Sequence, residues 1–393
     1  MEKIIDLKNM SRISSLLILI LCSIISVAQD LKFELLTTWE SLNQSLPISF
    51  GNNAEAIDLF NIGDFNKDGA TEFALRTSKD VWGNKVWDKT FGGSSSDQVN
   101  SIIQTSDGGY IIAGGAESND GDITSNNGSV DYWILKLDVN GNIVWNKTYG
   151  GTGLDSPSSI QQTSDGGYVI AGCSESINGD ISDGNNGYLD YWIIKLDGVG
   201  NKIWDKTYGG TEYDRAYSIQ QTSDLGYIIT GVTNSDDGDV SDSNNGSFDY
   251  WILKLDFNGN KVWDKTFGGS SADYANSIIQ TSDGGYIVAG TTTSVEINNY
   301  FAGVGYYWII KLDGNGNLIW NKVLGGSFYD YANSIAQTSD GGYIVAGHTN
   351  SNDGDISDGN NGETDYWIVK LDIDGNKVWD KTFGGTQDDE ARS

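Results

Sequence analysis

Short apolar runs separated by glycine turns recur at a regular spacing through most of the chain. SIIQTSDGGYIVAG (277–290) holds two apolar runs around an Asp-Gly-Gly turn, and YWILKLD (132–138) is apolar at nearly every position. Runs of this length that flank such turns are typical of β-hairpins. Helix start signals and apolar spacing at 3.6 residues are absent. The pattern therefore predicts an all-β protein.

The apolar runs belong to an internal repeat. The hairpin at 277 begins again, with small changes, at 101, 159, 218 and 334. A second hairpin follows it in each unit, built from YWIVKLD-like and KVWDKTF-like runs around an Asn-Gly or Asp-Gly turn. The second tryptophan of the units recurs every 57 to 59 residues, at Trp87, Trp145, Trp204, Trp263, Trp320 and Trp379. Each unit thus reads as four strands.

The third strand of each unit is apolar on both faces. In YWILKLD, Trp133 and Leu135 point to one side, and Tyr132 and Ile134 point to the other. A strand of this kind needs a packing partner on each face. Radially arranged four-stranded blades provide one, and we predict an all-β β-propeller of about six four-stranded blades. An open solenoid is the alternative, although a unit near 58 residues is long for one solenoid coil.

The repeat sets the expected domain boundaries. Basic residues precede the apolar run LLILILCSIISVA, which indicates a secretory signal peptide over residues 1–28 and a secreted or cell-surface protein. The run is too short to span a bilayer with confidence, and no membrane span is expected. An irregular first blade follows over 29–93, and five repeats cover 94–385. Residues 386–393 read as the start of a further repeat or as a closure tail.

The strand-turn-strand segment LDVNGNIVWNKTYGG (137–151) resembles the repeat of quinoprotein-like β-propellers, in which an Asp, a glycine turn and a Trp end each blade. The whole unit is similar to repeats of large secreted bacterial propellers that often end in a sorting domain. The resemblance covers roughly 94–385. It implies a fold, and it implies little about activity.

The composition narrows the choice of partner. The formal net charge of −30 argues against nucleic acid and anionic membranes, because both repel an acidic surface. The same charge is compatible with calcium. We expect a monomer whose partner is an unidentified protein or glycan.

One segment has the spacing of a calcium loop. IGDFNKDGATEFAL (62–75) places oxygen-bearing side chains at alternate positions around a glycine, as a hard cation requires. Leu75 at the twelfth position excludes an EF-hand. The segment resembles the calcium loops of FG-GAP-type propeller blades. That resemblance implies a calcium site formed by Asp64, Asn66, Asp68, the Ala70 carbonyl and Glu72. The alternative is a polar hairpin turn capped by Asp.

An acidic loop follows the second strand in most units. In SNDGDISDGNNGETD (351–365) and its equivalents, carboxylates and amides alternate closely. Residues that bind calcium or face a ligand there would include Asp122, Asp180, Asp239, Asp355 and Asp358. The fifth unit has only Glu296 in this loop, so the acidic loop is not required by the fold. Calcium binding and a solvated connector are the two interpretations.

The strand order places the acidic loops and the loops between blades at the same end of the blades. An Asp recurs in each inter-blade loop, and we expect it to accept backbone N–H groups there. It stands at Asp97, Asp155, Asp214, Asp273, Asp330 and Asp389. Aromatic neighbours vary and concentrate in the later blades, which predicts a one-sided binding patch. Its expected ligand contacts are Tyr213, Tyr274, Tyr329 and Tyr331.

No catalytic residue stands out. His348 and Cys173 occupy the same position in different units, so they do not form a dyad in a six-blade ring. We therefore expect a secreted, calcium-supported propeller that binds without catalysis and is not an enzyme. A propeller enzyme that acts on polysaccharide and a purely structural extracellular module are the alternatives.

Overall fold

In a computed structural model, the protein is described over residues 57–63, 72–77, 87–298 and 303–389. All of these residues belong to one compact unit, 49–393. The predicted signal peptide over 1–28 lies outside the described residues.

The described strands form six antiparallel sheets, numbered here in chain order. Sheet 1 contains β1 (Ile57–Gly63), β2 (Glu72–Thr77) and β3 (Asp88–Phe91). Sheet 2 contains β4 (Asp97–Gln104), β5 (Tyr110–Ala116), β6 (Asp131–Leu137) and β7 (Ile143–Tyr149). Sheet 3 contains β8 (Asp155–Gln162), β9 (Tyr168–Ser174), β10 (Asp190–Leu196) and β11 (Lys202–Tyr208).

The last three sheets repeat this plan. Sheet 4 contains β12 (Asp214–Gln221), β13 (Tyr227–Thr233), β14 (Asp249–Leu255) and β15 (Lys261–Phe267). Sheet 5 contains β16 (Asp273–Gln280), β17 (Tyr286–Thr292), β18 (Tyr306–Leu312) and β19 (Leu318–Leu324), with the short helix α2 (Val295–Asn298) after β17. Sheet 6 contains β20 (Asp330–Gln337), β21 (Tyr343–Thr349), β22 (Asp365–Leu371) and β23 (Lys377–Phe383).

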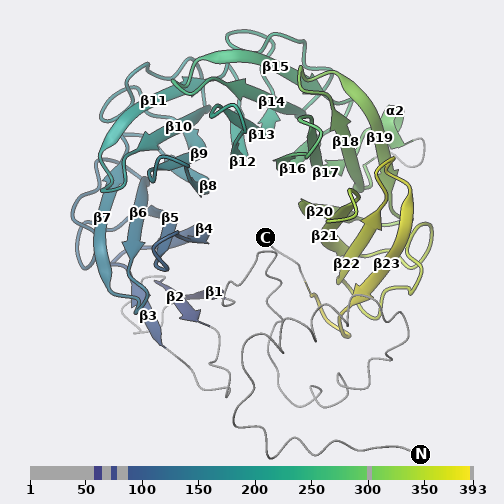
Figure 1. Cartoon of the computed structure of the whole chain (residues 1–393), viewed down its shortest axis with the longest axis horizontal. Coiled ribbons are helices and arrows are strands. Elements are labelled where there is room, and N and C mark those ends of the chain that lie inside the picture. Colours follow the sequence, from purple (N-terminus) through teal and green to yellow (C-terminus); the bar gives the residue numbers. More distant parts are fainter. Residues whose placement is uncertain (1–56, 64–71, 78–86, 299–302, 390–393) are drawn as a thin grey trace, which may run out of the picture. The chain divides into compact units, whose positions relative to one another are not determined.

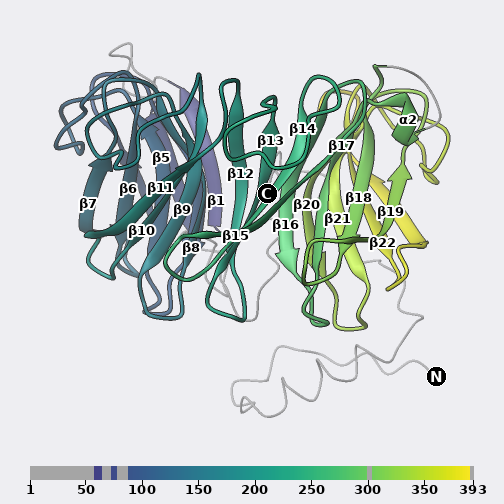
Figure 2. The same cartoon turned by 90° about the horizontal axis from the view of Figure 1, so that it is seen from above.

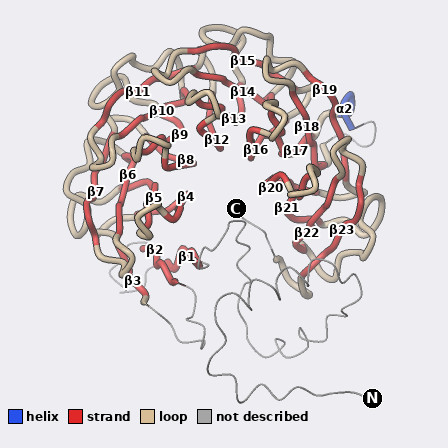
Figure 3. Tube along the Cα trace, in the orientation of Figure 1, coloured by secondary structure: helices blue, strands red, loops and turns tan. Residues whose placement is uncertain are grey.

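The strands of each sheet follow chain order from the inside to the outside. In Figure 1 the sheets stand side by side around a common axis, with β4, β8, β12, β16 and β20 innermost and β7, β11, β15, β19 and β23 outermost. Figure 3 shows that strands and their connections make up nearly all of the described chain. The connections gather at the two ends of the strands (Figure 2). The prediction of repeated four-stranded antiparallel sheets in an all-β fold is confirmed.

The third strand of sheets 2 to 5 is buried on both faces against the neighbouring sheets, as its two apolar faces predict. Tyr191 on β10 donates its hydroxyl hydrogen to the Trp251 carbonyl of sheet 4 at 3.1 Å, and the two rings lie 4.5 Å apart. The adjacent Trp192 points to the other side, where Tyr132 of sheet 2 lies 4.6 Å from it. Both tryptophans are fully buried. The core therefore consists of layers between sheets.

The outer strands lock onto the next sheet through a glycine turn. Trp145 on β7 meets the ring of Tyr168 edge-on at 5.9 Å. A Cβ at Gly200 would lie 2.9 Å from the Trp145 indole, and Gly200 has φ +79°. The glycine thus satisfies both the turn and the close approach of the indole. This explains why the second tryptophan and the Asn-Gly or Asp-Gly turn recur together.

Within the described ranges, no helix is long and apolar enough to cross a membrane.

Candidate functional site

The acidic loops lie against the double-glycine loops that join consecutive sheets. Between sheets 3 and 4, the Gly209 N–H donates to the Asp239 carboxylate at 3.4 Å, and the Asp239 N–H donates to the Gly209 carbonyl at 2.9 Å. The equivalent carboxylates that accept from the equivalent glycine N–H are Asp122, Asp180 and Asp355. The two kinds of loop therefore share one end of the sheets, here called the long-loop end.

A second side chain of the acidic loop strengthens this contact. Asp237 Oδ1 accepts a hydrogen bond from the Thr211 N–H at 2.8 Å. In sheet 5, Glu296 on α2 takes the corresponding place and accepts from the Ser270 hydroxyl at 2.6 Å. The sequence marked the fifth unit as lacking the acidic loop, but the structure places its single carboxylate in the same contact. The acidic loops thus hold consecutive sheets together.

The remaining acidic-loop prediction, Asp358, pairs with a lysine of the outer strand. Its Oδ2 lies 2.7 Å from Lys381 Nζ, and both side chains are about half exposed. Asp183 and Asp242 make the same ion pair in sheets 3 and 4. Among the residues that the structure describes, no three His, Cys, Asp or Glu side chains are arranged as a metal site.

The predicted FG-GAP-like calcium loop is described only at its last residue, Glu72. Asp64, Asn66, Asp68 and Ala70 lie outside the described residues. Glu72 is the first residue of β2. Phe73 pairs with Phe91 in sheet 1 as Tyr132 pairs with Tyr149 in sheet 2. By this register, Glu72 occupies the position that Asp131 has in sheet 2.

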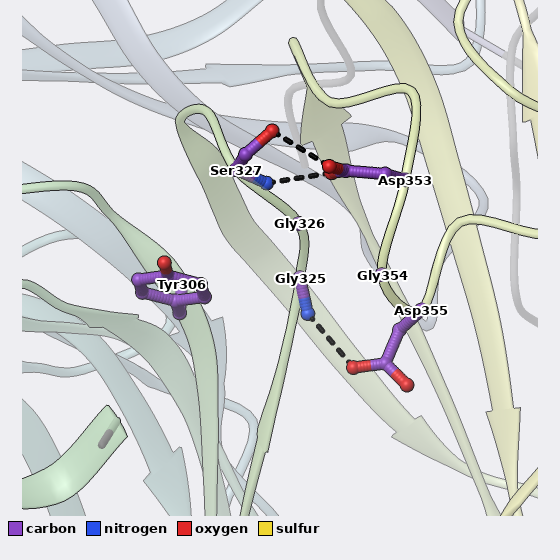
Figure 4. Close-up of a pocket in the computed structure, with 7 residues that line it drawn as sticks. All are labelled: Tyr306, Gly325, Gly326, Ser327, Asp353, Gly354 and Asp355. Carbon is purple, nitrogen blue, oxygen red and sulfur yellow. Dashed lines mark hydrogen bonds between the residues drawn. The ribbon is translucent and has the colours of Figure 1, made fainter. Parts of the chain in front are cut away.

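A cavity of about 350 Å³ lies between the two loops at the junction of sheets 5 and 6 (Figure 4). Asp353 accepts from the Ser327 N–H at 2.7 Å and from its hydroxyl at 2.8 Å, and Asp355 accepts from the Gly325 N–H at 3.2 Å. Tyr306 lines the cavity where four of the other sheets begin their third strand with Asp. The cavity is part of the junction between loops, and the carboxylates of Asp353 and Asp355 are engaged there.

The recurring Asp of the inter-blade loop has the backbone role that the sequence predicts. Asp214 is fully buried, and it accepts from the Gly210 N–H at 2.8 Å and from the Ser235 hydroxyl at 2.8 Å. The equivalent glycine N–H groups donate to Asp97, Asp155, Asp273, Asp330 and Asp389. Burial, only partly offset by these hydrogen bonds, raises the pKa of Asp330 to about 7. These residues therefore support the loops.

Aromatic rings form a continuous series near the inner strands at the long-loop end. The distance between ring centroids is 6.3 Å from Tyr188 to Tyr213, 5.6 Å from Tyr213 to Phe248 and 5.8 Å from Phe248 to Tyr274. These contacts cross sheets 3, 4 and 5. In sheet 6, Tyr329 and Tyr331 stack at 6.0 Å with an angle of 6° between their planes. We call Tyr188, Tyr213, Phe248, Tyr274, Tyr329 and Tyr331 the aromatic arc.

Backbone contacts between sheets position the arc. Leu189 forms an isolated parallel bridge with Tyr213, and the Asp214 N–H donates to the Leu189 carbonyl at 2.6 Å. The Asp273 N–H donates to the Phe248 carbonyl at 2.6 Å, which sets Tyr274 beside Phe248. Burial, with smaller contributions from the phenols of Tyr329 and Tyr274, raises the pKa of Tyr331. The arc therefore rests on rigid strand ends.

The arc joins the four tyrosines that the sequence predicts as ligand contacts to two aromatic residues that it missed. Tyr188 is 65% exposed, and Phe248 is partly buried between two tyrosines. Tyr188 stands two residues before the third strand of its sheet, where the other units have Ser, Val or Glu, and Phe248 stands one residue before it, where the other units have Val, Leu, Gly or Thr. Variation at these positions within a uniform repeat was the available signal.

An arginine stands beside the arc. Arg215 on β12 places its guanidinium 5.5 Å from the ring of Tyr217. The inner strands β4, β8, β12, β16 and β20 carry no other basic residue. Its Nε is buried and has no hydrogen-bond partner, and no described carboxylate forms an ion pair with it.

The histidine and the described cysteine occupy separate environments. Cys173 is buried, its thiol faces the Ser156 carbonyl at 3.7 Å, and burial raises its pKa to about 11. His348 stacks on Tyr331 at 5.1 Å. A thiol with this pKa is protonated at neutral pH and is a poor nucleophile.

The chain was compared with known proteins. No family model matches it. It is 23% identical over 220 residues to the regulatory protein FlaEY of Caulobacter vibrioides, a match that covers 50% of this chain and 23% of that protein. The chain thus spans about a quarter of the length of that relative.

Solved structures show a coarse likeness. The Pan2 WD40 domain of Neurospora crassa is 12% identical, with 78% of this chain and 73% of that chain covered at a TM-score of 0.44. The apocarotenoid oxygenase of Synechocystis is 10% identical, with 86% and 74% covered at 0.43. The quinohemoprotein alcohol dehydrogenase of Comamonas testosteroni is 11% identical, with 81% and 60% covered at 0.40. The likeness concerns the fold alone, and this chain has a repeat β-propeller-like fold.

Proposed function

We propose that this chain is a non-catalytic β-propeller of about six blades that binds an oligosaccharide through the aromatic arc. The observation that carries the proposal is the unbroken series of ring contacts from Tyr188 to Tyr274 across three sheets. Among the described residues, these rings lie in sheets 3 to 6 and not in sheet 2, so the arc is not needed by every blade. A feature that the fold does not need in every unit is a candidate for ligand recognition.

The chemistry of the arc favours a glycan over a protein partner. Tyrosine combines an apolar ring face with a polar hydroxyl, which suits a sugar ring that has C–H faces and hydroxyl edges. Tyr329 is 45% exposed, while Tyr213, Phe248 and Tyr274 are each partly buried. Rings held in this way offer faces to a ligand at little entropic cost, because their rotamers are already restricted.

Binding without turnover is part of the proposal. Cys173 is buried with a raised pKa, and His348 is stacked on Tyr331, so neither is placed as a nucleophile–base pair. A propeller enzyme that acts on polysaccharide is one alternative, and it would bind the same class of ligand. A purely structural extracellular module is the other alternative, and it predicts no ligand.

We further propose that the protein is a secreted monomer that calcium stabilises through the loop Asp64–Glu72, and that sheet 1 belongs to the first of six blades. The apolar run at 16–28 supports export, and the alternation of oxygen-bearing residues in 64–72 supports the calcium site.

The experiment is a binding screen of the secreted chain against soluble polysaccharides and their oligomers, followed by calorimetry on each hit. Phe248→Ala and Tyr329→Ala should each weaken binding about fivefold, as expected for the loss of one ring contact. Phe257→Ala is the matched control, because Phe257 is 63% exposed in the turn between β14 and β15, at the opposite end of the strands. Mass spectrometry of the recovered oligomer should show no change in length.

Each alternative has its own outcome. Shortened oligomers would favour the enzyme, and an absence of binding to every polysaccharide would contradict the proposed function. An equal loss of affinity in all three variants would mean that the ligand binds exposed aromatic rings non-specifically and not the arc.

A further inference from the structure

Arg215 is a basic side chain that forms no ion pair among the described residues of a strongly acidic protein. The chain has a net charge of −30, yet the one basic side chain on the five innermost strands forms no ion pair with a described carboxylate. The lysines of the third strands behave differently. Lys254, for example, lies 2.9 Å from Asp224. Within the described repeat, a cation near the core is normally neutralised, and Arg215 is the exception.

The acidic residue next to Arg215 in sequence is already occupied. Asp214 precedes Arg215 in sequence, but its carboxylate accepts from the Gly210 N–H and the Ser235 hydroxyl on the other side of β12. The guanidinium instead faces aromatic side chains: the ring centroid of Tyr217 lies at 5.5 Å, and a side-chain hydrogen bond links the guanidinium to the uncharged Tyr213. Ring faces attract a guanidinium only modestly compared with a carboxylate.

A partly desolvated guanidinium that lacks an anionic partner is a site for one. Its planar fork of N–H groups matches the two oxygens of a carboxylate, and no described carboxylate forms an ion pair with it. Tyr213 belongs both to the aromatic arc and to the surroundings of Arg215. A sugar ring on the arc would therefore bring a ring substituent within reach of the guanidinium.

We infer that the ligand is an acidic oligosaccharide, and that the carboxylate of a uronic acid residue pairs with Arg215 while its ring packs on Tyr213 and Phe248. This inference rests on the proposed function and adds the charge of the ligand to it. The overall charge of the protein opposes any anion at long range. Recognition therefore depends on the short-range pair with Arg215, and added salt should not abolish it as it abolishes non-specific attraction.

The test uses oligogalacturonate, oligoglucuronate and oligomannuronate, each beside its fully methyl-esterified form. Esterification removes the charge and keeps the sugar ring. For wild-type protein, at least one acid should bind about tenfold more tightly than its ester, because a hydrogen bond to a charged group is worth about that factor. Arg215→Gln should remove this preference by weakening the binding of the acid about tenfold, with a smaller loss for the ester, whose carbonyl still accepts a hydrogen bond from the guanidinium of the wild type. Arg215→Lys should keep part of the preference for the acid, because lysine retains the positive charge but lacks the planar pair of N–H donors.

Controls separate the two levels of the proposal. Lys147→Gln removes a cation on the outer strand β7, where Lys147 donates to Asn201, and it should not change the preference. Thermal unfolding of each variant verifies the fold, and Arg215→Lys carries the test if Arg215→Gln does not fold. Equal binding of acid and ester would overturn the inference and leave glycan binding intact. Absence of binding by every acid and ester would overturn the inference, and binding of a peptide with a free C-terminal carboxylate in their place would overturn the glycan proposal as well.

Discussion

The hydroxyl of Tyr191 donates a hydrogen bond to the carbonyl of Trp251, 3.1 Å away across the boundary between sheets 3 and 4. The same contact joins Tyr132 to Trp192, Tyr250 to Trp308 and Tyr307 to Trp367. Each of sheets 2 to 5 thus binds the next sheet through one aromatic pair on the third strand. Stability in such a repeat depends on these interfaces between neighbours as well as on the sheets themselves.

Removal of one such contact should have a measurable cost. We expect Tyr191→Phe to lower the free energy of unfolding by about 1 kcal/mol, because a buried hydrogen bond is lost. Tyr191→Ala should cost about 3–5 kcal/mol through the cavity that it leaves. Urea unfolding followed by tryptophan fluorescence measures both. Tyr188→Phe is the control, since Tyr188 is 65% exposed, and an equal loss in that variant would contradict the assignment.

A strained residue offers a stabilising substitution. Leu225 has φ +67°, in the turn position where the equivalent residues are Gly108, Gly166, Gly284 and Gly341. A side chain in this left-handed conformation costs about 1–2 kcal/mol. Leu225→Gly should therefore raise the free energy of unfolding by about 1 kcal/mol, after the greater entropy of the unfolded glycine is subtracted. Calorimetric unfolding should show a higher Tm.

The reverse change is the matched test. Gly166 has φ +83°, and no heavy atom lies within 4 Å of the place that a Cβ would occupy, so Gly166→Leu introduces the strain without a clash at that atom. It should destabilise the protein by a similar amount. If both substitutions leave Tm unchanged, the left-handed conformation is not a source of strain here.

The repeat pattern alone predicted the sheets, their order and the role of the inter-blade Asp, because each depends on local alternation and on contacts that recur in every unit. Glu296 shows where this reasoning failed. Its sequence context shares nothing with the other acidic loops, but α2 brings its carboxylate to the Ser270 hydroxyl at 2.6 Å. The same contact is made in sheet 5, but a different backbone conformation brings the carboxylate to it. The sequence of the fifth unit therefore does not repeat the pattern of the other acidic loops.

The aromatic arc was predictable in part. Tyr213, Tyr274, Tyr329 and Tyr331 stand beside the recurring Asp, where the repeat gives their register. Phe248 comes from the far end of a loop of variable length, and its place between Tyr213 and Tyr274 depends on the packing of one sheet against the next. Such contacts between units cannot be read from the sequence of one unit.

Stability should fall as pH rises from about 4 to 7. Burial raises the pKa of Asp190 to about 7, and it raises the pKa of Asp131 and Asp249 to about 6. In this window the folded chain keeps protons that the unfolded chain has released, so each unit of pH lowers the free energy of unfolding. The effect levels off at about pH 8, about one pH unit above the folded pKa of Asp190, where both states are ionised. Asp190 alone accounts for at most about 4 kcal/mol.

Asp190→Asn isolates this contribution, because asparagine keeps an acceptor for the Asn186 N–H, which donates to Asp190 at 2.7 Å. Urea unfolding at about pH 4.5 and pH 8, in a chelating buffer, should show a smaller loss for the variant than for wild type. The general repulsion among the acidic residues is nearly the same in both proteins and largely cancels in the difference. An identical pH dependence would mean that Asp190 is ionised in the folded state.

Calcium should bind at about one ion per chain rather than about five. The acidic-loop carboxylates already accept hydrogen bonds, as Asp239 does from the Gly209 N–H and Asp355 from the Gly325 N–H, so an ion there would have to displace the contacts that join the sheets. The loop Asp64–Glu72 has the better spacing of oxygen ligands.

Native mass spectrometry with and without a chelator counts the bound calcium ions. Asp68→Ala should abolish calcium binding and lower Tm. Asp355→Ala should also lower Tm, but that variant should still bind the ion. About five ions would make the acidic loops calcium sites, and none would remove calcium from the proposed function altogether.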